Sequence, residues 1–363
     1  MSVRSEHSRA IRLKQVMQQE GVSALLVTKR ENVRYLTGFT GSAGSVLLAG
    51  RRKPSLITDF RYKLQAAREK TAGITVHIQK KDFAAALQET AEAYSVDTVW
   101  FDESSLTLEV LKRLKKEGLS LKGHRDLVGE LRQRKDVQEL KHIREAVRRA
   151  EESFREMKKY IRPGARECDL ALMLEILMRE KGARKAAFDT IVASGRNGAM
   201  PHASTTNRRI GQGDLVTFDF GAEAGGYFSD ITRTYCIGRP TERQREIHGL
   251  VLAAQTAAIK NVRPGIACKA VDAAARNIIK RAGQGDRFGH GTGHGIGLMV
   301  HEAPSLSPLS KDTVAQDMVF TVEPGVYIPG WGGVRIEDMV LVSGNGAKVL
   351  TSLPRALEGL KLL

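Results

Sequence analysis

The sequence predicts a two-domain protein of the α/β (α+β) class, and three observations support this prediction. The chain has 363 residues, more than one compact core usually accommodates. Its first third alternates helical and strand patterns. Its remainder contains an internal repeat. We therefore expect an α/β domain over residues 1–130 and a second domain over residues 131–363, built from two similar halves about a pseudo-two-fold axis.

Periodicity predicts the elements of the first domain. Apolar residues at helical spacing predict helices over residues 8–20 and 82–94. Short apolar runs predict three strands, over residues 22–27, 45–49 and 55–58. The segment NVRYLTGFTGSAG, residues 32–44, combines polar residues with glycines and is typical of a loop at a strand edge or of a substrate contact. Little in this domain suggests catalysis, so we expect the chemistry in the second domain.

A long amphipathic helix opens the second domain. Asp136 and Glu139 have the spacing of a capping box, with Asp in place of Ser or Thr. Apolar residues after them recur at intervals of three, four and seven. Pro163 and Gly164 end the helix.

An internal repeat follows this helix. The Arg-Pro-Gly turn at residues 162–164 recurs at residues 263–265, and Gly182 recurs as Gly283, both at an offset of 101. Each half consists of a helix, this turn, and a helix with a glycine after it. The repeat extends into the strand-like segments DLVTFDFG and DMVFTVEPG, which each deliver a carboxylate. If the halves pack about a pseudo-two-fold axis, these acids can converge on one point.

The net charge of the chain is unusual. A total of 57 Lys and Arg against 41 Asp and Glu gives +16. Residues 1–130 carry +7 of this charge and residues 131–363 carry +9, so the excess is spread over both domains. A nucleic-acid-binding arm would concentrate basic residues in a low-complexity block, and the chain has none. The spread of the charge over both domains therefore argues against nucleic acid as a partner.

Cysteine content and hydropathy bear on the compartment. Cys168, Cys236 and Cys268 are odd in number and far apart, which predicts reduced thiols instead of a disulfide framework or a zinc ribbon. The first residues lack the apolar core of a signal peptide. No stretch approaches the roughly 18 apolar residues of a membrane helix. We expect a cytoplasmic protein without a membrane segment.

Four carboxylates lie in strand-like segments of the second domain. They are Asp219, Asp230, Glu323 and Glu337. Because a buried, ionised carboxylate without a partner is very costly, these acids require cations. Arg233 and Arg335 could supply ordinary ion pairs. A metal ion is the alternative.

Three histidines favour the metal. His290, His294 and His301 lie within twelve residues in a glycine-rich segment, and neutral imidazoles bind transition metals. A donor set of carboxylate oxygens with few nitrogens and no thiolate suits Mn²⁺, Co²⁺ or Fe²⁺, and sometimes Zn²⁺. Four carboxylates exceed the need of one such ion, and carboxylates bridge metals well. We therefore expect two divalent ions.

Four segments carry the strongest motifs: GHGTGHGIGLMVHE, TVEPGVYIPGWGGVRIED, VTFDFG and YFSDITRTY. They resemble the signatures of the pita-bread metallopeptidases, in particular the prolidase and aminopeptidase P branch. NVRYLTGFTGSAG resembles the N-terminal domain of the same branch, so the resemblance covers essentially the whole chain. It implies a creatinase-like N-terminal α/β domain, a catalytic pita-bread domain and a homodimer.

The resemblance implies a metal-binding role for five residues. Asp219 would bind one ion, whereas Asp230 and Glu337 would bridge both. His294 and Glu323 would complete the second ion's ligands. Glu323 would also transfer a proton during catalysis.

The resemblance also implies contacts with the substrate. His202 and His301 would hold the scissile carbonyl oxygen or the proline nitrogen and act in catalysis. His290 would line the proline pocket. Tyr327 and Arg335 would support the site.

The activity implied is metal-dependent hydrolysis of Xaa-Pro bonds in di- or oligopeptides, with Mn²⁺ as the first choice of metal. The short segment between Tyr327 and Arg335 favours a dipeptidase over an aminopeptidase. A methionine aminopeptidase is an alternative, but such enzymes do not normally carry this N-terminal domain. Creatine hydrolases lack the metal ligands present here. A non-catalytic relative that binds nucleic acid or histones is a further alternative, but such relatives characteristically lose ligands.

Overall fold

The computed structural model describes residues 3–358, with side chains from residue 9 onward. The chain folds into two compact units, residues 1–132 and 133–363. Each unit has its own hydrophobic core. None of the described helices combines the length and apolar character that a membrane crossing requires.

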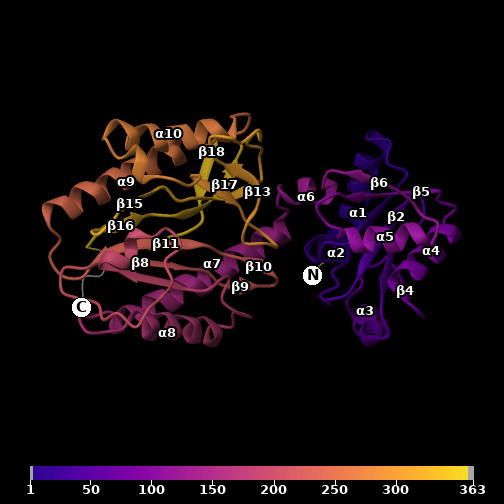
Figure 1. The fold of residues 1–363 in the computed structure, drawn as a ribbon, viewed down its shortest axis with the longest axis horizontal. Helices are drawn as coiled ribbons and strands as arrows, with labels where there is room; N and C mark the ends of the chain where they lie inside the picture. The colour runs from indigo at the N-terminus through magenta and orange to yellow at the C-terminus, as the bar shows by residue number, and fades with distance from the viewer. Residues whose placement is uncertain (1–2, 359–363) are drawn as a thin grey trace. The chain divides into compact units, whose positions relative to one another are not determined.

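The first unit is built on a six-stranded mixed sheet with the strand order β4-β3-β2-β1-β5-β6 (Figure 1). Its strands are β1 (Ala24–Val27), β2 (Ser45–Ala49), β3 (Ser55–Thr58), β4 (Thr75–Ile78), β5 (Thr98–Asp102) and β6 (Ser120–His124). Its helices are α1 (Val3–Gln19), α2 (Arg30–Thr37), η1 (Phe60–Tyr62), α3 (Lys63–Glu69), α4 (Phe83–Ala93), α5 (Leu108–Lys116) and α6 (Leu127–Arg132). Strands β1 to β3 are fully buried, which explains their continuous apolar sequences.

The prediction of a loop over residues 32–44 is wrong for its first part. Residues 30–37 form the amphipathic helix α2, which buries Val33, Tyr35 and Leu36. Gly38 ends this helix in the left-handed conformation, with φ of 75°. The helix has only eight residues, so its period is hard to recognise beside the glycines that follow. Residues 38–44 are irregular, as expected.

The second unit contains four long helices and twelve strands among its described residues. The helices are α7 (Val137–Met157), α8 (Glu167–Glu180), α9 (Glu242–Asn261) and α10 (Cys268–Arg281), with the short turns η2 (Lys158–Tyr160), η3 (Gly195–Ala199) and η4 (Gly285–Arg287). The strands of the first half are β7 (Ile191–Ser194), β8 (Leu215–Phe220), β9 (Glu223–Ala224), β10 (Tyr227–Phe228) and β11 (Ile231–Cys236). Those of the second half are β12 (Gly293–Gly295), β13 (Glu302–Leu306), β14 (Val319–Val322), β15 (Gly325–Ile328), β16 (Gly332–Arg335), β17 (Asp338–Ser343) and β18 (Gly346–Val349).

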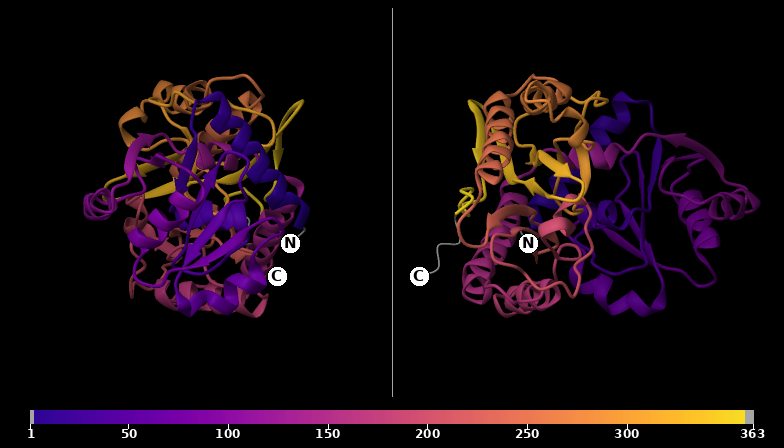
Figure 2. Two further views of the ribbon diagram at one scale, coloured as in Figure 1. Left: turned by 90° about the vertical axis from the view of Figure 1, so that its right-hand side faces the viewer. Right: turned by 60° about the vertical axis from the view of Figure 1, so that its left-hand side comes forward.

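The structure contains the predicted internal repeat. Helices α8 and α10 both have 14 residues, and their bounds differ by the offset of 101 seen in the sequence. The antiparallel order β11-β8-β7 in the first half corresponds to β17-β14-β12 in the second. Figures 1 and 2 show the strands of this unit between the pair α7 and α8 and the pair α9 and α10. The fold is therefore the predicted pseudo-two-fold arrangement following an α/β domain.

Two local features place the strands of the first half. The predicted capping box at the start of α7 is present, since the Asp136 side chain accepts from backbone N–H groups and the Glu139 carboxylate accepts from the backbone N–H of Asp136. Further along α7, Phe154 stacks on Phe220, with ring centroids 5.1 Å apart, and contacts Phe218 edge-on at 5.3 Å. Because side chains alternate along a strand, this packing turns Asp219 of β8 to the opposite face.

Candidate metal centre and substrate cavity

Five potential metal ligands meet where strands of the two halves come together. His294 lies in β12 and Asp219 in β8, while Asp230, Glu323 and Glu337 lie directly beside the ends of β11, β14 and β17. The ligand atoms of Asp230, His294 and Glu337 all lie within 4.8 Å of one another. His294 Nε2 is also 3.3 Å from Glu323 Oε1. The two halves of the repeat thus bring their acids to one point, as the sequence predicts.

Asp230 and Glu337 of this cluster are buried and mutually repulsive, whereas Asp219 and Glu323 are half-buried. Asp230 is 5% exposed and Glu337 is 1% exposed. Burial, followed by the charges of neighbouring carboxylates, raises the pKa of both groups well above the ordinary range. Asp219 Oδ1 and Glu337 Oε1 are buried without a hydrogen-bond donor among the described residues. Buried carboxylate oxygens that lack donors and line one cavity fit a divalent cation.

The His294 ring is oriented as a metal ligand. Its Nδ1 lies 3.1 Å from the carbonyl oxygen of Gly295, which can only accept, so Nδ1 carries the proton. Nε2 then faces Asp230 Oδ2 at 3.6 Å and Glu323 Oε1 at 3.3 Å. Burial opposes protonation of the ring, but the hydrogen bond with Glu323 raises the pKa of His294, so a cation bound here would replace a proton on Nε2. A histidine that donates one N–H to a backbone carbonyl while its other nitrogen faces the ion is a recurring arrangement in metal sites.

Arg335 connects two of the carboxylates. Its guanidinium donates to Asp219 Oδ2 at 2.7 Å, and its Nε donates to Thr232 Oγ1 at 3.2 Å. Thr232 Oγ1 in turn donates to Glu337 Oε2 at 2.7 Å. The ion pair considered from the sequence is therefore present for Asp219, but it uses one oxygen and leaves Oδ1 without a donor.

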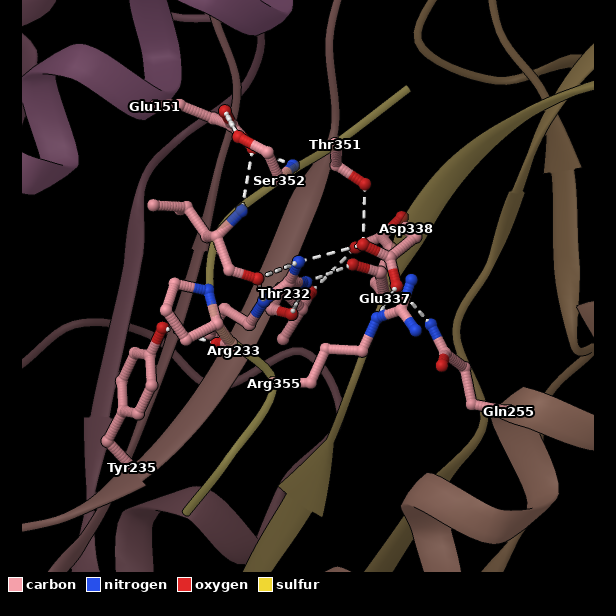
Figure 3. A network of polar contacts seen from close by, with 12 residues as sticks. Glu151, Thr232, Arg233, Tyr235, Gln255, Glu337, Asp338, Thr351, Ser352 and Arg355 are labelled. Atoms are coloured by element: carbon pink, nitrogen blue, oxygen red, sulfur yellow. Dashed lines mark hydrogen bonds and ion pairs between the residues drawn. The ribbon is translucent and has the colours of Figure 1, made fainter. Parts of the chain in front are cut away.

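The second arginine, Arg233, belongs to a network behind the metal centre (Figure 3). It pairs with Asp338 at 2.7 Å, and both side chains are at most 1% exposed. It also donates to the backbone carbonyl of Glu337. The remaining donors to Asp338 are the side chains of Gln255, Thr351 and Arg355. This network fixes the backbone of Glu337 from the side opposite the cavity, and the sequence analysis did not identify it.

A cavity of about 450 Å³ opens over the cluster. All ten residues singled out from the sequence line it: His202, Asp219, Asp230, His290, His294, His301, Glu323, Tyr327, Arg335 and Glu337. His202 and His301 are exposed on its walls. The His301 and His294 rings lie 4.3 Å apart between centroids. Ten residues spread over more than 130 positions of the sequence, from His202 to Glu337, thus line one cavity.

Hydrogen bonds fix the orientation of His290 and Tyr327. His290 Nδ1 lies 2.8 Å from the Gly291 carbonyl oxygen and must donate to it. Burial lowers the pKa of His290, so its ring is neutral and Nε2 is an acceptor. The Tyr327 hydroxyl, 3.0 Å away, therefore donates to Nε2 and accepts from Arg335 at 3.0 Å. The result is a directed series of hydrogen bonds from Arg335 through Tyr327 to His290.

The sequence analysis missed several residues of the cavity wall. These are Phe188, Asp189, Ile191, Pro201, Ser305 and Ser307, together with two glycines of the histidine segment. Phe188 precedes His290 by 102 residues, close to the repeat offset, so the repeat itself could have identified residues 188–191.

Comparisons with known proteins agree with this site. The model of metallopeptidase family M24 matches residues 141–344, and that of the creatinase/prolidase N-terminal domain matches residues 9–134. An Xaa-Pro dipeptidase of Pyrococcus horikoshii is 38% identical over 344 residues, which cover 94% of this chain and 96% of the relative.

Two solved structures are similar over nearly the full length. An Xaa-Pro dipeptidase from Bacillus anthracis superimposes with a TM-score of 0.93 at 37% identity, covering 97% of this chain and 99% of that one. An X-Pro aminopeptidase from Thermotoga maritima superimposes with a TM-score of 0.87 at 37% identity, covering 95% and 99%.

Proposed function

Because this chain belongs to metallopeptidase family M24 and carries a creatinase/prolidase N-terminal domain, we propose that it hydrolyses Xaa-Pro peptide bonds and prefers dipeptides. The observation that carries the proposal is the single cavity lined by all ten predicted residues. Its volume of about 450 Å³ lies at the small end of ligand pockets, which supports a dipeptide as substrate. Relatives named Xaa-Pro dipeptidase and X-Pro aminopeptidase support the substrate class.

We propose two divalent ions as cofactors, Mn²⁺ first, with Co²⁺, Fe²⁺ and Zn²⁺ as alternatives. Asp219, Asp230, His294, Glu323 and Glu337 would hold them. When bound, such ions lower the pKa of a water molecule and polarise a carbonyl oxygen. Glu323 lies beside His294 and opens on the cavity, so its carboxylate would accept a proton from the attacking water and return it to the product.

The remaining cavity residues would bind and orient the peptide. His202 and His301 would donate hydrogen bonds to the scissile carbonyl oxygen or act at the proline nitrogen. That nitrogen leaves as a ring amine and must be protonated in place. His290, whose two ring nitrogens are already engaged, would offer its ring to the proline. Tyr327 and Arg335 would keep that ring and Asp219 in position.

A panel of peptides tests the proposal. The Mn²⁺-loaded protein is assayed on Gly-Pro, Met-Pro, an Xaa-Pro-Yaa tripeptide and Met-Ala-Ser. We expect rapid cleavage of the dipeptides, slower cleavage of the tripeptide and none of Met-Ala-Ser. Comparable rates on the dipeptides and the tripeptide would remove the dipeptidase assignment, and cleavage of Met-Ala-Ser would favour a methionine aminopeptidase. Full activity after exhaustive chelation would contradict the metal mechanism.

The expected homodimer and cytoplasmic location stay predictions. Non-catalytic relatives that bind nucleic acid or histones characteristically lose metal ligands. The five candidate ligands are intact and line one cavity, which favours an enzyme.

A further inference from the structure

Among the buried carboxylates outside the candidate metal centre, two lie on the related helices α8 and α10, one in each half of the repeat. Glu167 is the first residue of α8 and is 0% exposed, and Asp272 lies in the second turn of α10 and is 1% exposed. A buried carboxylate is retained at a cost unless its oxygens are well supplied with donors. In both cases at least two of these donors come from a segment that carries a cavity histidine.

Glu167 organises the segment between β7 and residue 206. Its Oε1 accepts from the backbone N–H and the hydroxyl of Ser194, both at 2.6 Å. Its Oε2 accepts from Asn197 Nδ2 at 2.9 Å and from the backbone N–H and hydroxyl of Thr206 at 3.0 and 2.6 Å. These five hydrogen bonds clamp both ends of a segment whose middle carries His202.

The position of the His202 ring is set by its backbone, which this clamp holds at both ends and which Arg335 also holds at the Pro201 carbonyl, at 3.0 Å. Across residues 3–358, no hydrogen bond to the His202 side chain is present, and the ring is exposed on the cavity wall. Its location is therefore set by the backbone between Ser194 and Thr206. Glu167 is the buried charge that holds both ends of that backbone.

Asp272 has the same relation to His290. Its Oδ1 accepts from the backbone N–H of Thr292 at 3.1 Å and from the Thr292 hydroxyl at 2.8 Å. It also pairs with Arg276 at 2.7 Å, and Arg276 donates to the backbone carbonyl of His290 at 2.7 Å. The carbonyl of Thr292 accepts from the backbone N–H of Glu323 at 2.7 Å. Asp272 thus holds the segment that leads from His290 into β12.

The repeat relates these two clamps. Asp272 corresponds to Ala171, one helical turn after Glu167. The residues that they bind lie at opposite ends of the equivalent strands. Ser194 is the last residue of β7, whereas Thr292 comes directly before β12. Equivalent helices therefore hold opposite ends of equivalent strands. One clamp acts on the segment that leaves its strand and the other on the segment that enters it.

We propose that Glu167 and Asp272 are positioning residues that place the histidines His202 and His290 on the walls of the substrate cavity. The proposal rests on the proposed function for its activity readout. Glu167→Gln replaces one acceptor oxygen with an NH₂ group, which would face N–H and O–H donors. The change therefore weakens the hydrogen bonds of the clamp with almost no change in side-chain volume. The change removes the hydrogen bonds that one oxygen accepts, two at Oε1 or three at Oε2, and it removes the negative charge that strengthens the others, which would free His202 to move.

A double-mutant cycle tests the first clamp. We expect Glu167→Gln to lower kcat/KM on an Xaa-Pro dipeptide at least tenfold, with bound Mn²⁺ unchanged. In a His202→Ala background the same change should have no further effect, because Glu167 acts through His202. An equal loss in both backgrounds would overturn the proposal and assign Glu167 a general structural role. If Glu167→Gln does not fold, Thr206→Val removes one hydroxyl donor, and the same cycle applies to it.

Asp272→Asn in a His290→Ala background provides the second cycle. Because Asp272 also fixes Thr292 and thereby Glu323, we expect His290→Ala to remove most, but not all, of its effect. A loss that is undiminished in this background would overturn the role assigned to Asp272.

Spectroscopy separates failure of this proposal from failure of the proposed function. In the Zn²⁺-loaded protein with ¹³C-labelled histidine, Glu167→Gln should shift or broaden the His202 ring signal and leave that of His290 unchanged. Asp272→Asn should do the reverse. This result would support the clamps even if the wild-type protein cleaves no Xaa-Pro peptide. Unchanged signals in both variants would overturn them even if it does.

Discussion

Asp230 and Glu337 show why this cavity binds cations at the scale of single residues. Both carboxylates are buried, and each lies within 4.8 Å of the other and of His294. Without a cation, such groups repel one another and lack solvation. The same arrangement that destabilises the metal-free protein therefore creates affinity for a divalent ion. This is the expected exchange of stability for function at a site.

Asp230→Asn separates these two effects. The change removes one negative charge at constant size. The affinity for Mn²⁺ and the kcat/KM for an Xaa-Pro dipeptide should therefore both fall at least a hundredfold. In chelator, however, the variant should unfold at a higher temperature than the wild type, because repulsion among the carboxylates is reduced. Metal analysis, a hydrolysis assay and thermal unfolding measure the three outcomes.

Asp189→Asn is the matched control for this variant. Asp189 is an exposed acid that lines the same cavity, and no hydrogen bond or ion pair of its side chain is present in the described part of the chain. It should retain its metal and its stability in chelator. A metal-free Asp230→Asn protein that is less stable than the wild type would contradict the charge argument.

At the scale of elements, the helices are stabilised by the faces that they bury against the strands. The apolar stripe of α7 predicted where this helix lies in the sequence, and the spacing of Asp136 and Glu139 predicted its cap, because both are local properties. The buried face of α9 also carries polar groups, among them His248, which is 4% exposed. Burial lowers the pKa of His248 to about 4 from an ordinary value of 6.5. The folded protein therefore holds this ring neutral.

His248 makes stability depend on pH. Because its folded pKa is lower than its unfolded pKa, its contribution is fully present above about pH 6.5 and is lost as the pH falls toward 4. The shift corresponds to about 3 kcal/mol in total, of which about 2 kcal/mol should be lost by pH 5. We expect His248→Gln to remove this part of the pH dependence.

Urea unfolding at pH 7.5 and pH 5 in chelator measures the effect of His248. The comparison is the difference between the two pH values in the wild type and in the variant, which cancels the contribution of other groups. An equal loss of stability in both proteins would show that His248 does not titrate on unfolding.

At the scale of the whole molecule, the candidate ligands all belong to the second of the two compact units. All five lie between residues 219 and 337, whereas residues 1–132 form a separate unit with its own core. A ligand that binds only the folded state stabilises the unit that contains its site. Metal binding should therefore affect the two units unequally.

Hydrogen exchange monitored by mass spectrometry tests this prediction. Addition of Mn²⁺ should slow exchange in β8, β11, β14 and β17 and leave β1, β2 and β3 unchanged. In protein carrying Asp230→Asn, addition of Mn²⁺ should not slow exchange in any of these strands. Equal protection of both units would indicate that metal binding is coupled to the first unit as well.

The diffuse positive charge is also a property of the whole molecule. The acids of the metal centre are among the 41 acidic residues, so two bound divalent ions would largely neutralise them. The remaining surface is then more basic than the count of +16 suggests. Its even division between residues 1–130 and 131–363 indicates a general surface property, which bears on solubility and on the attraction of peptide carboxylates.

The sequence by itself determined the fold class and the repeat, because these are recorded in local spacing, and its resemblance to a known family supplied the set of candidate ligands. Asp219 follows from strand alternation, and the capping box follows from the spacing of Asp136 and Glu139 at the start of α7. The choice of His294 among the three histidines of the glycine-rich segment follows from the family resemblance. The helix α2 was missed because tertiary burial of Val33 and Leu36, more than the local pattern, supports so short a helix.

Only the tertiary structure decided how the site residues are held. Arg335 could have paired with any acid, and the structure places it on one oxygen of Asp219 while the other oxygen has no donor. Asp338 is adjacent to Glu337 in sequence, but it faces Arg233 instead of the cavity. In the sequence, Glu167 and Asp272 resemble ordinary helix residues. Their role is visible only in the structure, where distant segments donate hydrogen bonds to them. Such contacts join residues far apart in the chain, so their geometry depends on packing and is absent from any local pattern.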